Sequence, residues 1–406
     1  MRDILLCDLN NFYASCEIAQ NENLKNLPVA IAGSVEERKG VVIAKNYLAK
    51  SYGVDVGDLV FEAKQKCPNL VVFETNFGLY NDYSRKVREI YLKYTDRVEP
   101  FSIDECYLDV TNSKIFGSPI EIAEKIKSEV KDKLNLTLSI GVSYNKTFAK
   151  IASEFKKPDA ISVVTKDDYK SKIWDLSIDK MVGVGDRLKE KFEKYGIIKI
   201  KDLALANKEF LSNLLGKVGR DLYEFANGND NREVELYENY IKPKSVSNST
   251  TFKRDLIKKD DIILAFNVIS ESIVKRMIKY NLINASTMTV FAKDKTLQTF
   301  SKQVSFEYPT RSTNVITNKA VEVFYNFFNL DAVRQLGISL TNFDRINGYN
   351  IFQKKSEIFD IDKAVLNINE KLGKKAVFKA NNLLDKDIAS SFDRPPLIKK
   401  WTKIKQ

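Results

Sequence analysis

The chain has 406 residues, of which 44% are hydrophobic, and it carries 65 lysines and arginines against 54 aspartates and glutamates, a net charge of +11. This length suits about three domains at ~100 to 200 residues each, and the positive charge favours a polyanionic partner such as nucleic acid. Histidine is absent, which excludes mechanisms that need an imidazole base, a Ser-His pair or a histidine-ligated metal.

The cysteines are Cys7, Cys16, Cys67 and Cys106, and they show no paired metal-binding spacing. Because Cys7 and Cys106 fall inside apolar strand patterns, we interpret them as buried thiols of a reducing compartment. Residues 1–6 lack a signal-peptide pattern, and no apolar run reaches membrane-spanning length. We therefore expect a cytoplasmic protein without a membrane partner.

Strand and helix patterns alternate through the first hundred residues. One strand is predicted to end at Asp8, and Asn10 or Asn11 is suited to cap the helix that follows. Residues 24–74 form a small insert in this pattern. The predicted elements, in order, are a strand at 4–7, a helix to about residue 20, strands at 28–32 and 41–44, and helices at 47–52 and 79–94.

Two adjacent acids, Asp104 and Glu105, interrupt an apolar stretch at 101–110. A buried strand tolerates neither acid without a partner, so we predict a β-hairpin with the pair at its tip. A helix with one apolar stripe and an alternating strand follow, at about 122–134 and 136–142. Without the insert the order is β-α-β-β-α-β, a ferredoxin-like topology that brings Asp8 beside the hairpin.

A cluster of Asp8, Asp104 and Glu105 would need a cation. Two like charges about 4 Å apart repel by roughly 1 kcal/mol in water and roughly 4 kcal/mol near a protein surface. Carboxylate oxygens without a soft donor select Mg²⁺ or Mn²⁺. From these residues alone, an ordinary solvated turn and an ordinary strand end remain the alternative.

Lysines gather around the next predicted helix, which Asn145 caps. Its members Lys146 and Lys150, with Lys156 and Lys157 beyond, would face phosphates if the carboxylates hold metal. A solvated basic helix face explains the same pattern equally well.

Short helical patterns fill 165–231, and they include Gly183 and Gly185 ahead of an amphipathic helix. This arrangement resembles a helix-hairpin-helix, in which glycines let backbone N–H groups approach a phosphate, although a tight turn between helices has the same pattern. The polar residues 229–244 predict a linker.

A second β-α-β-β-α-β pattern follows the linker and has no acid pair at its hairpin. Its elements are a strand at 245–252, a helix at 260–280, strands at 286–293 and 299–306, a helix at 314–328, and a strand at 333–342. Basic residues interleaved with serine and threonine suit a phosphate backbone, and they are Lys244, Lys253, Arg254, Lys293 and Lys302. A tail with one amphipathic helix at about 362–372 completes the chain.

Four stretches resemble the Y-family, or translesion, DNA polymerases of the polymerase IV kind. They are DLNNFYAS at 8–15, AKNYLAK at 44–50, SIDECYLD at 102–109 and SIGVSYNKTFAKIAS at 139–153. The resemblance spans about 1–345 in the right order. It implies an α+β right hand with a ferredoxin-like palm at 1–10 and 75–165, fingers at 11–74, a helical thumb at 166–231, a linker at 232–243, a βαββαβ little finger at 244–345 and a tail at 346–406.

The resemblance implies template-directed, low-fidelity addition of deoxynucleotides to a DNA primer. In the family, the residues matching Asp8, Asp104 and Glu105 hold two Mg²⁺ ions, for which Mn²⁺ can substitute, and the carbonyl of Leu9 assists. One ion lowers the pKa of the primer 3′ hydroxyl, and the other draws charge from the triphosphate. No histidine base is required.

Nucleotide contacts also carry over from the family. Tyr13 matches the steric gate that rejects a 2′ hydroxyl, with Phe12 beside it, and Tyr47, Lys50 and Lys157 match triphosphate contacts. By pattern alone, Tyr13 is a core aromatic one turn into a helix. The implied partners are primer-template DNA and deoxynucleoside triphosphates, and we expect a monomer.

The chain departs from the family pattern in the fingers. Lys50 replaces arginine, so a bidentate fork becomes a point charge. Ala44 replaces a threonine, and Asp58-Leu59 replaces a Met-Pro or similar pair after Gly57. These changes affect triphosphate orientation and the wall over the nascent base pair.

A peptide for the sliding clamp is degenerate in this chain. The nearest match is 348–352, where the glutamine is missing and the apolar residues lie within Tyr349 to Phe352. A hydrophobic anchor for the following helix is an equally good interpretation.

Two other functions compete with the polymerase. A nucleotide cyclase also uses a βαββαβ palm with metal-binding acids, but it leaves the basic second domain unexplained. A DNA-binding relative without catalysis would not need all three acids.

Overall fold

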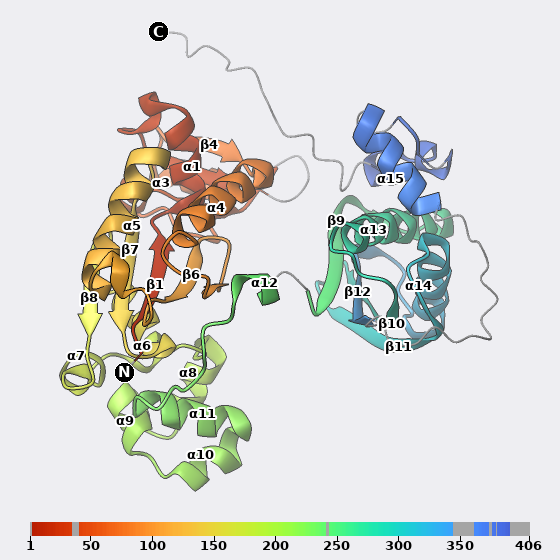
Figure 1. Ribbon diagram of the computed structural model, residues 1–406. Helices are drawn as coiled ribbons and strands as arrows, with labels where there is room; N and C mark the ends of the chain where they lie inside the picture. Colours follow the sequence, from red (N-terminus) through yellow and green to blue (C-terminus); the bar gives the residue numbers. More distant parts are fainter. Residues whose placement is uncertain are drawn as a thin grey trace. The chain divides into compact units, whose positions relative to one another are not determined.

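The computed structural model describes residues 2–34, 40–240, 243–343, 361–372, 376–378 and 380–389. The chain forms two compact units, Met1–Ala32 with Val42–Tyr240 and Gly33–Val41 with Ile241–Gln406. Figure 1 labels the helices and strands of both.

A five-stranded sheet is the centre of the first unit, in the order β5-β6-β1-β7-β8. Its strands are β1 (Ile4–Leu9), β5 (Val98–Pro100), β6 (Glu105–Asp109), β7 (Leu138–Ser143) and β8 (Ile161–Val164). β1 pairs antiparallel with β6 on one side and β7 on the other. The predicted ferredoxin-like order is therefore confirmed, and β8, which the sequence patterns did not predict, extends it parallel to β7.

Alternate residues of β1 serve two cores on opposite faces of this sheet. Leu5 and Cys7 pack in the core that also contains residues of α4 (Phe77–Tyr91) and α5 (Pro119–Leu134). Ile4 and Leu6 pack on the other face with residues that include Ala149 of α6 (Lys146–Ser153) and Val234. Every residue of β1 is buried, as expected for a strand covered on both faces.

A smaller sheet, β3-β2-β4, forms with two helices the part of this unit predicted as an insert at 24–74, and α1 (Phe12–Gln20) precedes it. The elements of the insert are β2 (Val29–Ala32), β3 (Val42–Lys45), α2 (Tyr47–Ser51), α3 (Val60–Lys66) and β4 (Val71–Glu74). The sequence patterns missed α3 and β4. β4 has the partly exposed pattern of an edge strand, which gives a weak periodicity signal.

Short helices lie at the opposite end of this unit from α3 and β4 (Figure 1), and they share a hydrophobic core with residues of α6 and β8. They are α7 (Tyr169–Ile173), α8 (Asp186–Glu193), α9 (Ile200–Leu205), α10 (Lys208–Leu215) and α11 (Lys217–Ala226). Single 3₁₀ turns occur at Glu22–Leu24, Lys114–Phe116 and Ile178–Lys180.

Part of the predicted linker packs against the first unit. Val234 is fully buried beside β1, and both Nη atoms of Arg2 donate to backbone carbonyls of Asp230 and Arg232, at 2.7 and 2.8 Å. α12 (Tyr237–Tyr240) follows, and the Tyr237 N–H donates to the carbonyl of Asp96 at 3.1 Å. Residues 230–237 therefore pack along the sheet, and we call this segment the strap. Its polar composition did not indicate this packing.

The second unit is an antiparallel sheet in the order β11-β10-β12-β9, packed on two helices. Its elements are β9 (Ser245–Leu256), α13 (Lys259–Lys279), β10 (Ala285–Asp294), β11 (Thr299–Thr310), α14 (Thr313–Phe327) and β12 (Val333–Phe343). The second βαββαβ pattern is therefore confirmed. Beyond it lie α15 (Ile361–Leu372), a 3₁₀ turn at Ala380–Leu383, and α16 (Lys386–Ala389), whose Ile388 is buried in the same core.

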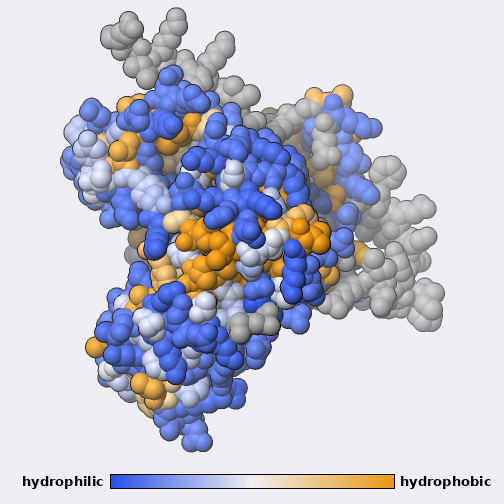
Figure 2. Space-filling view, turned by 60° about the vertical axis from the view of Figure 1, so that its left-hand side comes forward, coloured by the Kyte–Doolittle hydropathy of each residue, from blue (hydrophilic) through white to orange (hydrophobic). Residues whose placement is uncertain are grey.

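Most of the surface visible in Figure 2 is hydrophilic; the widest hydrophobic area lies near the middle of the view, and smaller ones lie around it. Within the described residues, none of the helices combines the length and apolar character needed to cross a bilayer.

Candidate active site

Asp8 and Glu105 meet because β1 and β6 pair them directly in the antiparallel register. Their side chains are 7% and 14% exposed, respectively. The Leu9 N–H donates to the carbonyl of Asp104 at 3.1 Å, which keeps the pairing tight at this end of the strands. Two of the three predicted acids therefore meet at one end of the paired strands β1 and β6.

Asp104 lies in the turn before β6, and Glu105 is already the first residue of that strand. The turn is residues 101–104, so the predicted tip is right for Asp104 to lie in the turn and wrong for Glu105. The Ser102 hydroxyl donates to Asp104 Oδ1 at 2.5 Å and accepts from the Glu105 N–H at 3.0 Å. These bonds hold the Asp104 carboxylate within the turn.

Glu154, which the sequence analysis did not identify, completes a group of three carboxylates. One oxygen of each of Asp8, Glu105 and Glu154 lies within 4.8 Å of the others. Glu154 follows α6 as its C-terminal cap. The only available sequence signal was its spacing from the two lysines, four residues after Lys150 and three before Lys157.

Lys150 and Lys157 neutralise these acids. Lys150 Nζ lies 3.3 Å from Asp8 Oδ2 and 3.1 Å from Glu154 Oε1, and it also pairs with Glu105. Lys157 Nζ lies 2.8 Å from Asp8 Oδ2 and 2.7 Å from Glu154 Oε1. Each ammonium is thus shared between Glu154 and at least one of the two more buried acids, Asp8 and Glu105, which we call the inner acids.

The pKa values of the inner acids move in opposite directions. Burial, with the hydrogen bond to Asp8, raises the pKa of Glu105 although Lys150 opposes this. Burial also acts to raise the pKa of Asp8, but the bond from Glu105 and the two lysines outweigh it and lower that pKa. Two carboxyl groups that share a site separate in this way because only one ionises readily.

The depth at which α6 packs determines the position of Lys150. A Cβ at Gly141 of β7 would lie 1.9 Å from the carbonyl oxygen of Ala149 and 2.5 Å from the Ser153 nitrogen, so only glycine permits this approach. The side chain of Asn145 caps the helix by accepting from the Phe148 N–H at 2.8 Å. The helix therefore lies directly on the sheet.

The remaining predicted lysines do not reach the acids. Lys146 pairs with Glu99 at 2.6 Å and lies 4.8 Å from the ring centre of Tyr107. Lys156 is exposed. Of the four lysines near α6, the structure brings only Lys150 and Lys157 to the carboxylates.

Asn10 joins two segments at the site, a role that the sequence analysis did not assign. Its Nδ2 donates to Ser139 Oγ at 3.0 Å, and its Oδ1 accepts from the Asp159 N–H at 2.9 Å. Because Asp159 follows closely after Lys157, this bond holds the loop that carries the lysine beside β1.

Tyr13 lies between an aromatic cluster and the acids. Its ring stacks on Tyr80 with centroids 4.5 Å apart and meets Phe77 edge-on at 6.1 Å. Burial, and then the charge of Asp104, raises the pKa of Tyr13. Phe12 beside it is buried, whereas Tyr13 keeps partial exposure.

α2 carries the other two predicted nucleotide contacts. Tyr47 is 37% exposed. Burial raises its pKa, and the charge of Lys157 opposes this rise. Lys50, one turn further along, is exposed. Ala44 packs against the main core of this unit, partly buried.

Asp58 closes a turn in this structure. Its Oδ2 accepts from the Asp55 N–H at 2.7 Å, and its carboxylate pairs with Lys66 at 2.8 Å. Gly57 before it has φ of 100°. The aspartate therefore stabilises the turn, and the following Leu59 is exposed.

The two glycines ahead of α8 differ in conformation. Gly183 has a left-handed φ of 94°, which favours glycine. Gly185 precedes the helix in an extended conformation, and a Cβ there would meet nothing within 4 Å. Gly185 is therefore exposed and uncrowded, and the predicted helix-hairpin-helix stays a prediction.

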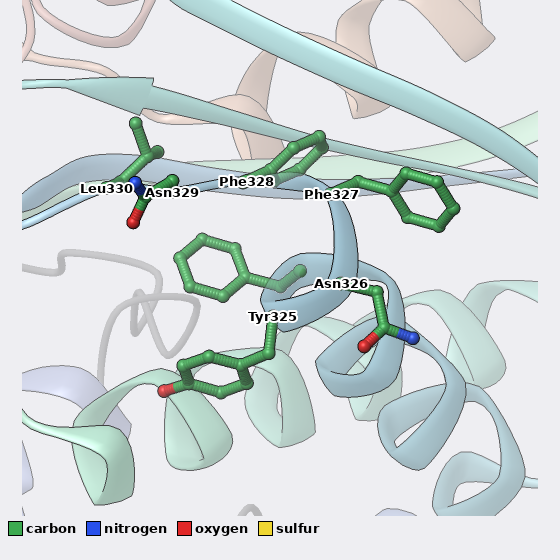
Figure 3. Close-up of a pocket in the computed structure, with 7 residues that line it drawn as sticks. Tyr325, Asn326, Phe327, Phe328, Asn329 and Leu330 are labelled. Atoms are coloured by element: carbon green, nitrogen blue, oxygen red, sulfur yellow. The ribbon is translucent and has the colours of Figure 1, made fainter.

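The predicted basic residues of the second unit do not share one face. Lys302 pairs with buried Val290 across the ladder, and its Nζ lies 4.3 Å from the ring centre of Phe327, on the helix side. Phe327 is the last residue of α14, and Figure 3 shows its ring at this end of the helix. Lys293 pairs with Thr299. Because it is three residues after Val290 on the same strand, its side chain lies on the other, open face of the sheet.

Arg254 and Lys253 contact the C-terminal segment. Arg254 pairs with Asp261 at 2.8 Å and with Asp385 at 2.7 Å, and Lys253 pairs with Asp387 at 2.9 Å. Lys244 is exposed. These ion pairs reduce the positive charge at this end of β9.

Small hydroxyl and amide side chains cross the open face in register. One row runs through Ser247, Ser339, Thr289 and Gln303 of the four strands. Such side chains donate hydrogen bonds to phosphate oxygens without reading base sequence.

A ferredoxin-like sheet with paired acids, a helical subdomain that carries an open glycine turn, and a second βαββαβ unit together define a polymerase of the right-hand class. Family models match this chain at 7–154, described as the impB/mucB/samB family, and at 243–351, described as its C-terminal domain.

Known proteins agree with that class. DNA polymerase IV of Acetivibrio thermocellus is 42% identical over 395 residues, which cover 95% of this chain and 99% of that protein. DNA polymerase IV 1 of Bacillus subtilis is 34% identical over 388 residues, or 94% and 93% of the two chains.

Solved structures extend the likeness to three dimensions. A Y-family DNA polymerase chimera of Dbh and Dpo4 superposes with a TM-score of 0.75 and 26% identity, over 84% of this chain and 99% of that one. An insertion ternary complex of Dbh DNA polymerase gives a TM-score of 0.63 at the same identity and coverage.

The chain belongs to the impB/mucB/samB family and is a Y-family, translesion-type, DNA-directed DNA polymerase. The cyclase and non-catalytic alternatives are thereby set aside.

Proposed function

We propose that this polymerase extends a primer with two divalent cations held by Asp8, Asp104, Glu105 and the carbonyl of Leu9. The observation that carries the proposal is the convergence of Asp8 and Glu105 on neighbouring strands, with Asp104 in the adjoining turn. Low-fidelity synthesis across damaged template sites is the function we expect from this site.

The residues present fit divalent cations. The carboxylates supply oxygen ligands only, as Mg²⁺ and Mn²⁺ prefer, and two ammonium groups already compensate their charge. When bound, the cations would lower the pKa of the primer 3′ hydroxyl and draw charge from the leaving pyrophosphate. We propose Mg²⁺ as the usual ion and Mn²⁺ as a substitute.

The deoxynucleoside triphosphate would be held between the fingers and the palm. In this proposal Lys157, Tyr47 and Lys50 contact the phosphates, and Tyr13 packs under the sugar with Phe12 behind it. Two observations support this. Lys157 Nζ pairs with Asp8, and Tyr47 lies close enough for the charge of Lys157 to act on its pKa.

Primer-template DNA is the proposed macromolecular partner, since a solved relative is described as an insertion ternary complex. In this proposal, residues 1–10 and 75–165 are the palm, 11–74 the fingers, 166–231 the thumb, and 244–345 the little finger. The thumb and the little finger would then contact the phosphate backbone of DNA through Gly183, Gly185, Lys244 and Lys293.

Three further features belong to this proposal. The four cysteines are free and buried, which suits a reducing cytoplasm. We propose a monomer. The clamp-binding peptide at Tyr349 to Phe352 lies outside the described residues and stays a prediction.

Primer extension with Asp104→Asn tests the metal site. The variant is expected to bind primer-template DNA like the wild type and to lose extension in both Mg²⁺ and Mn²⁺. Asp132→Asn on exposed α5 is the matched control and should keep full activity. Extension by Asp104→Asn at the wild-type rate would refute the proposed site.

A further inference from the structure

Two lysines occupy the metal site in this structure, and Glu154 contacts both. Lys150 Nζ and Lys157 Nζ lie 3.3 and 2.8 Å from Asp8 Oδ2, which the proposed function gives to a metal. The same two nitrogens lie 3.1 and 2.7 Å from Glu154 Oε1. The ammonium groups are therefore shared between the buried acids and a third carboxylate.

The carboxylates differ in their access to solvent. The side chain of Glu154 is 45% exposed, whereas those of Asp8 and Glu105 are 7% and 14% exposed. Glu154 thus lies on the outer side of the lysines, and the two other acids lie on the inner side. A short rotation of each lysine side chain would exchange an inner carboxylate for the outer one.

Charge balance makes such an exchange necessary. Without a cation, the lysines neutralise acids that would otherwise repel one another in a poorly solvated place. When a divalent cation binds Asp8 and Glu105, the same ammonium groups become like charges beside it. They then need another partner close by, and Glu154 is already in contact with both.

We propose that Glu154 is a positioning residue for metal loading: it receives the ammonium groups of Lys150 and Lys157 when a divalent cation displaces them from Asp8 and Glu105. This inference rests on the proposed metal site. The exchange leaves Lys157 next to the phosphates of the incoming nucleotide, and it makes the two lysines competitors of the metal until nucleotide arrives.

A thermodynamic cycle on Mn²⁺ affinity tests the exchange, measured by electron paramagnetic resonance on the full chain without DNA or nucleotide. Glu154→Gln should weaken Mn²⁺ binding roughly tenfold, because the displaced lysines lose their alternative partner. In a background of Lys150→Met with Lys157→Met, the same change should alter the affinity by less than about twofold.

Equal weakening in both backgrounds would overturn the exchange, because Glu154 would then act as a direct ligand or through its charge alone. No weakening in the wild-type background would overturn it as well. If the double lysine variant does not fold, the cycle is closed with Lys150→Met or Lys157→Met singly, and a smaller effect of Glu154→Gln in either background is the supporting result.

Two controls separate this inference from the proposed function. Glu124→Gln removes one exposed charge from α5, on the other face of the sheet from α6, and should leave the affinity unchanged; an effect equal to that of Glu154→Gln would refute the exchange. Asp8→Asn should abolish Mn²⁺ binding. If Asp8→Asn binds Mn²⁺ like the wild type, the metal site itself is refuted. If Asp8→Asn loses Mn²⁺ binding but Glu154→Gln has the same effect with and without the lysines, only the exchange is refuted.

Discussion

Asp8 and Glu105 face each other across β1 and β6, and the ammonium of Lys150 contacts both carboxylates. The pair is tied to the sheet register, because a shift of one residue would turn either side chain to the opposite face. Residues that hold the register and the depth of α6 should therefore affect catalysis without touching substrate.

Gly141→Ala is expected to destabilise the chain by about 3 kcal/mol and to lower polymerase activity. The added Cβ would collide with backbone atoms of Ala149 and Ser153, so α6 and Lys150 must move away from the sheet. Denaturant unfolding and primer extension measure the two effects. Gly185→Ala is the matched control for stability alone, because Gly185 is itself a proposed DNA contact. Its Cβ meets nothing within 4 Å, and it should change stability by less than about 0.5 kcal/mol.

Asp230→Asn should cost about 2 kcal/mol of stability at neutral pH. The buried carboxylate accepts from the Thr147 N–H at 3.0 Å and pairs with Arg232 at 2.7 Å. Burial acts to raise the pKa of Asp230, but its bonds to Arg232 and Thr147 outweigh that and lower it.

The pH dependence of this contribution follows from the lowered pKa. A carboxyl group with a lowered folded pKa stabilises the fold above its unfolded pKa of about 3.9, and that stability is lost as the pH falls through the folded value. The difference between wild type and Asp230→Asn in urea unfolding should therefore be constant from pH 8 to about 5 and shrink below about 4. A difference that grows in acid would contradict the assignment.

Tyr13→Ala should admit ribonucleotides. The ring is held by Tyr80 and Phe77 at the edge near Asp104, so its removal opens space under the sugar. Steady-state incorporation of matched ribo- and deoxynucleotides measures the selectivity, and Tyr13→Phe, which keeps the ring, should retain it. Unchanged sugar selection in Tyr13→Ala would count against the gate.

Lys293→Ala should weaken DNA binding equally on unrelated sequences and reduce the slope of log affinity against log salt by about 0.9. Lys302→Ala is the matched control on the neighbouring strand. Its ammonium lies over Phe327 on the helix side, so the slope should not change. Fluorescence anisotropy over a salt series provides both values, and equal slopes for the two variants would refute the assignment of faces.

Much of the fold was predictable because its periodic segments are long and strong. Both βαββαβ patterns, the strand that carries Asp8 and the helix capped by Asn145 follow from residue spacing alone, although this strand ends at Leu9 and not at Asp8. α3, β4 and β8 were missed, since short or partly exposed elements have too few residues to show a period. The polar residues 229–244 predict a linker, whereas residues 230–237 pack on the sheet through bonds from Arg2 to backbone carbonyls and through one buried valine, which composition does not indicate.

The sequence by itself determined the chemistry available to this protein. It has no histidine, it places Asp8, Asp104 and Glu105 where strands end, and its motifs follow the order of a polymerase. Only the tertiary structure decided which charges meet. Glu154 reaches Asp8 through the packing of α6 on Gly141. This outcome depends on contacts between segments far apart in the chain, about which local residue patterns carry no information.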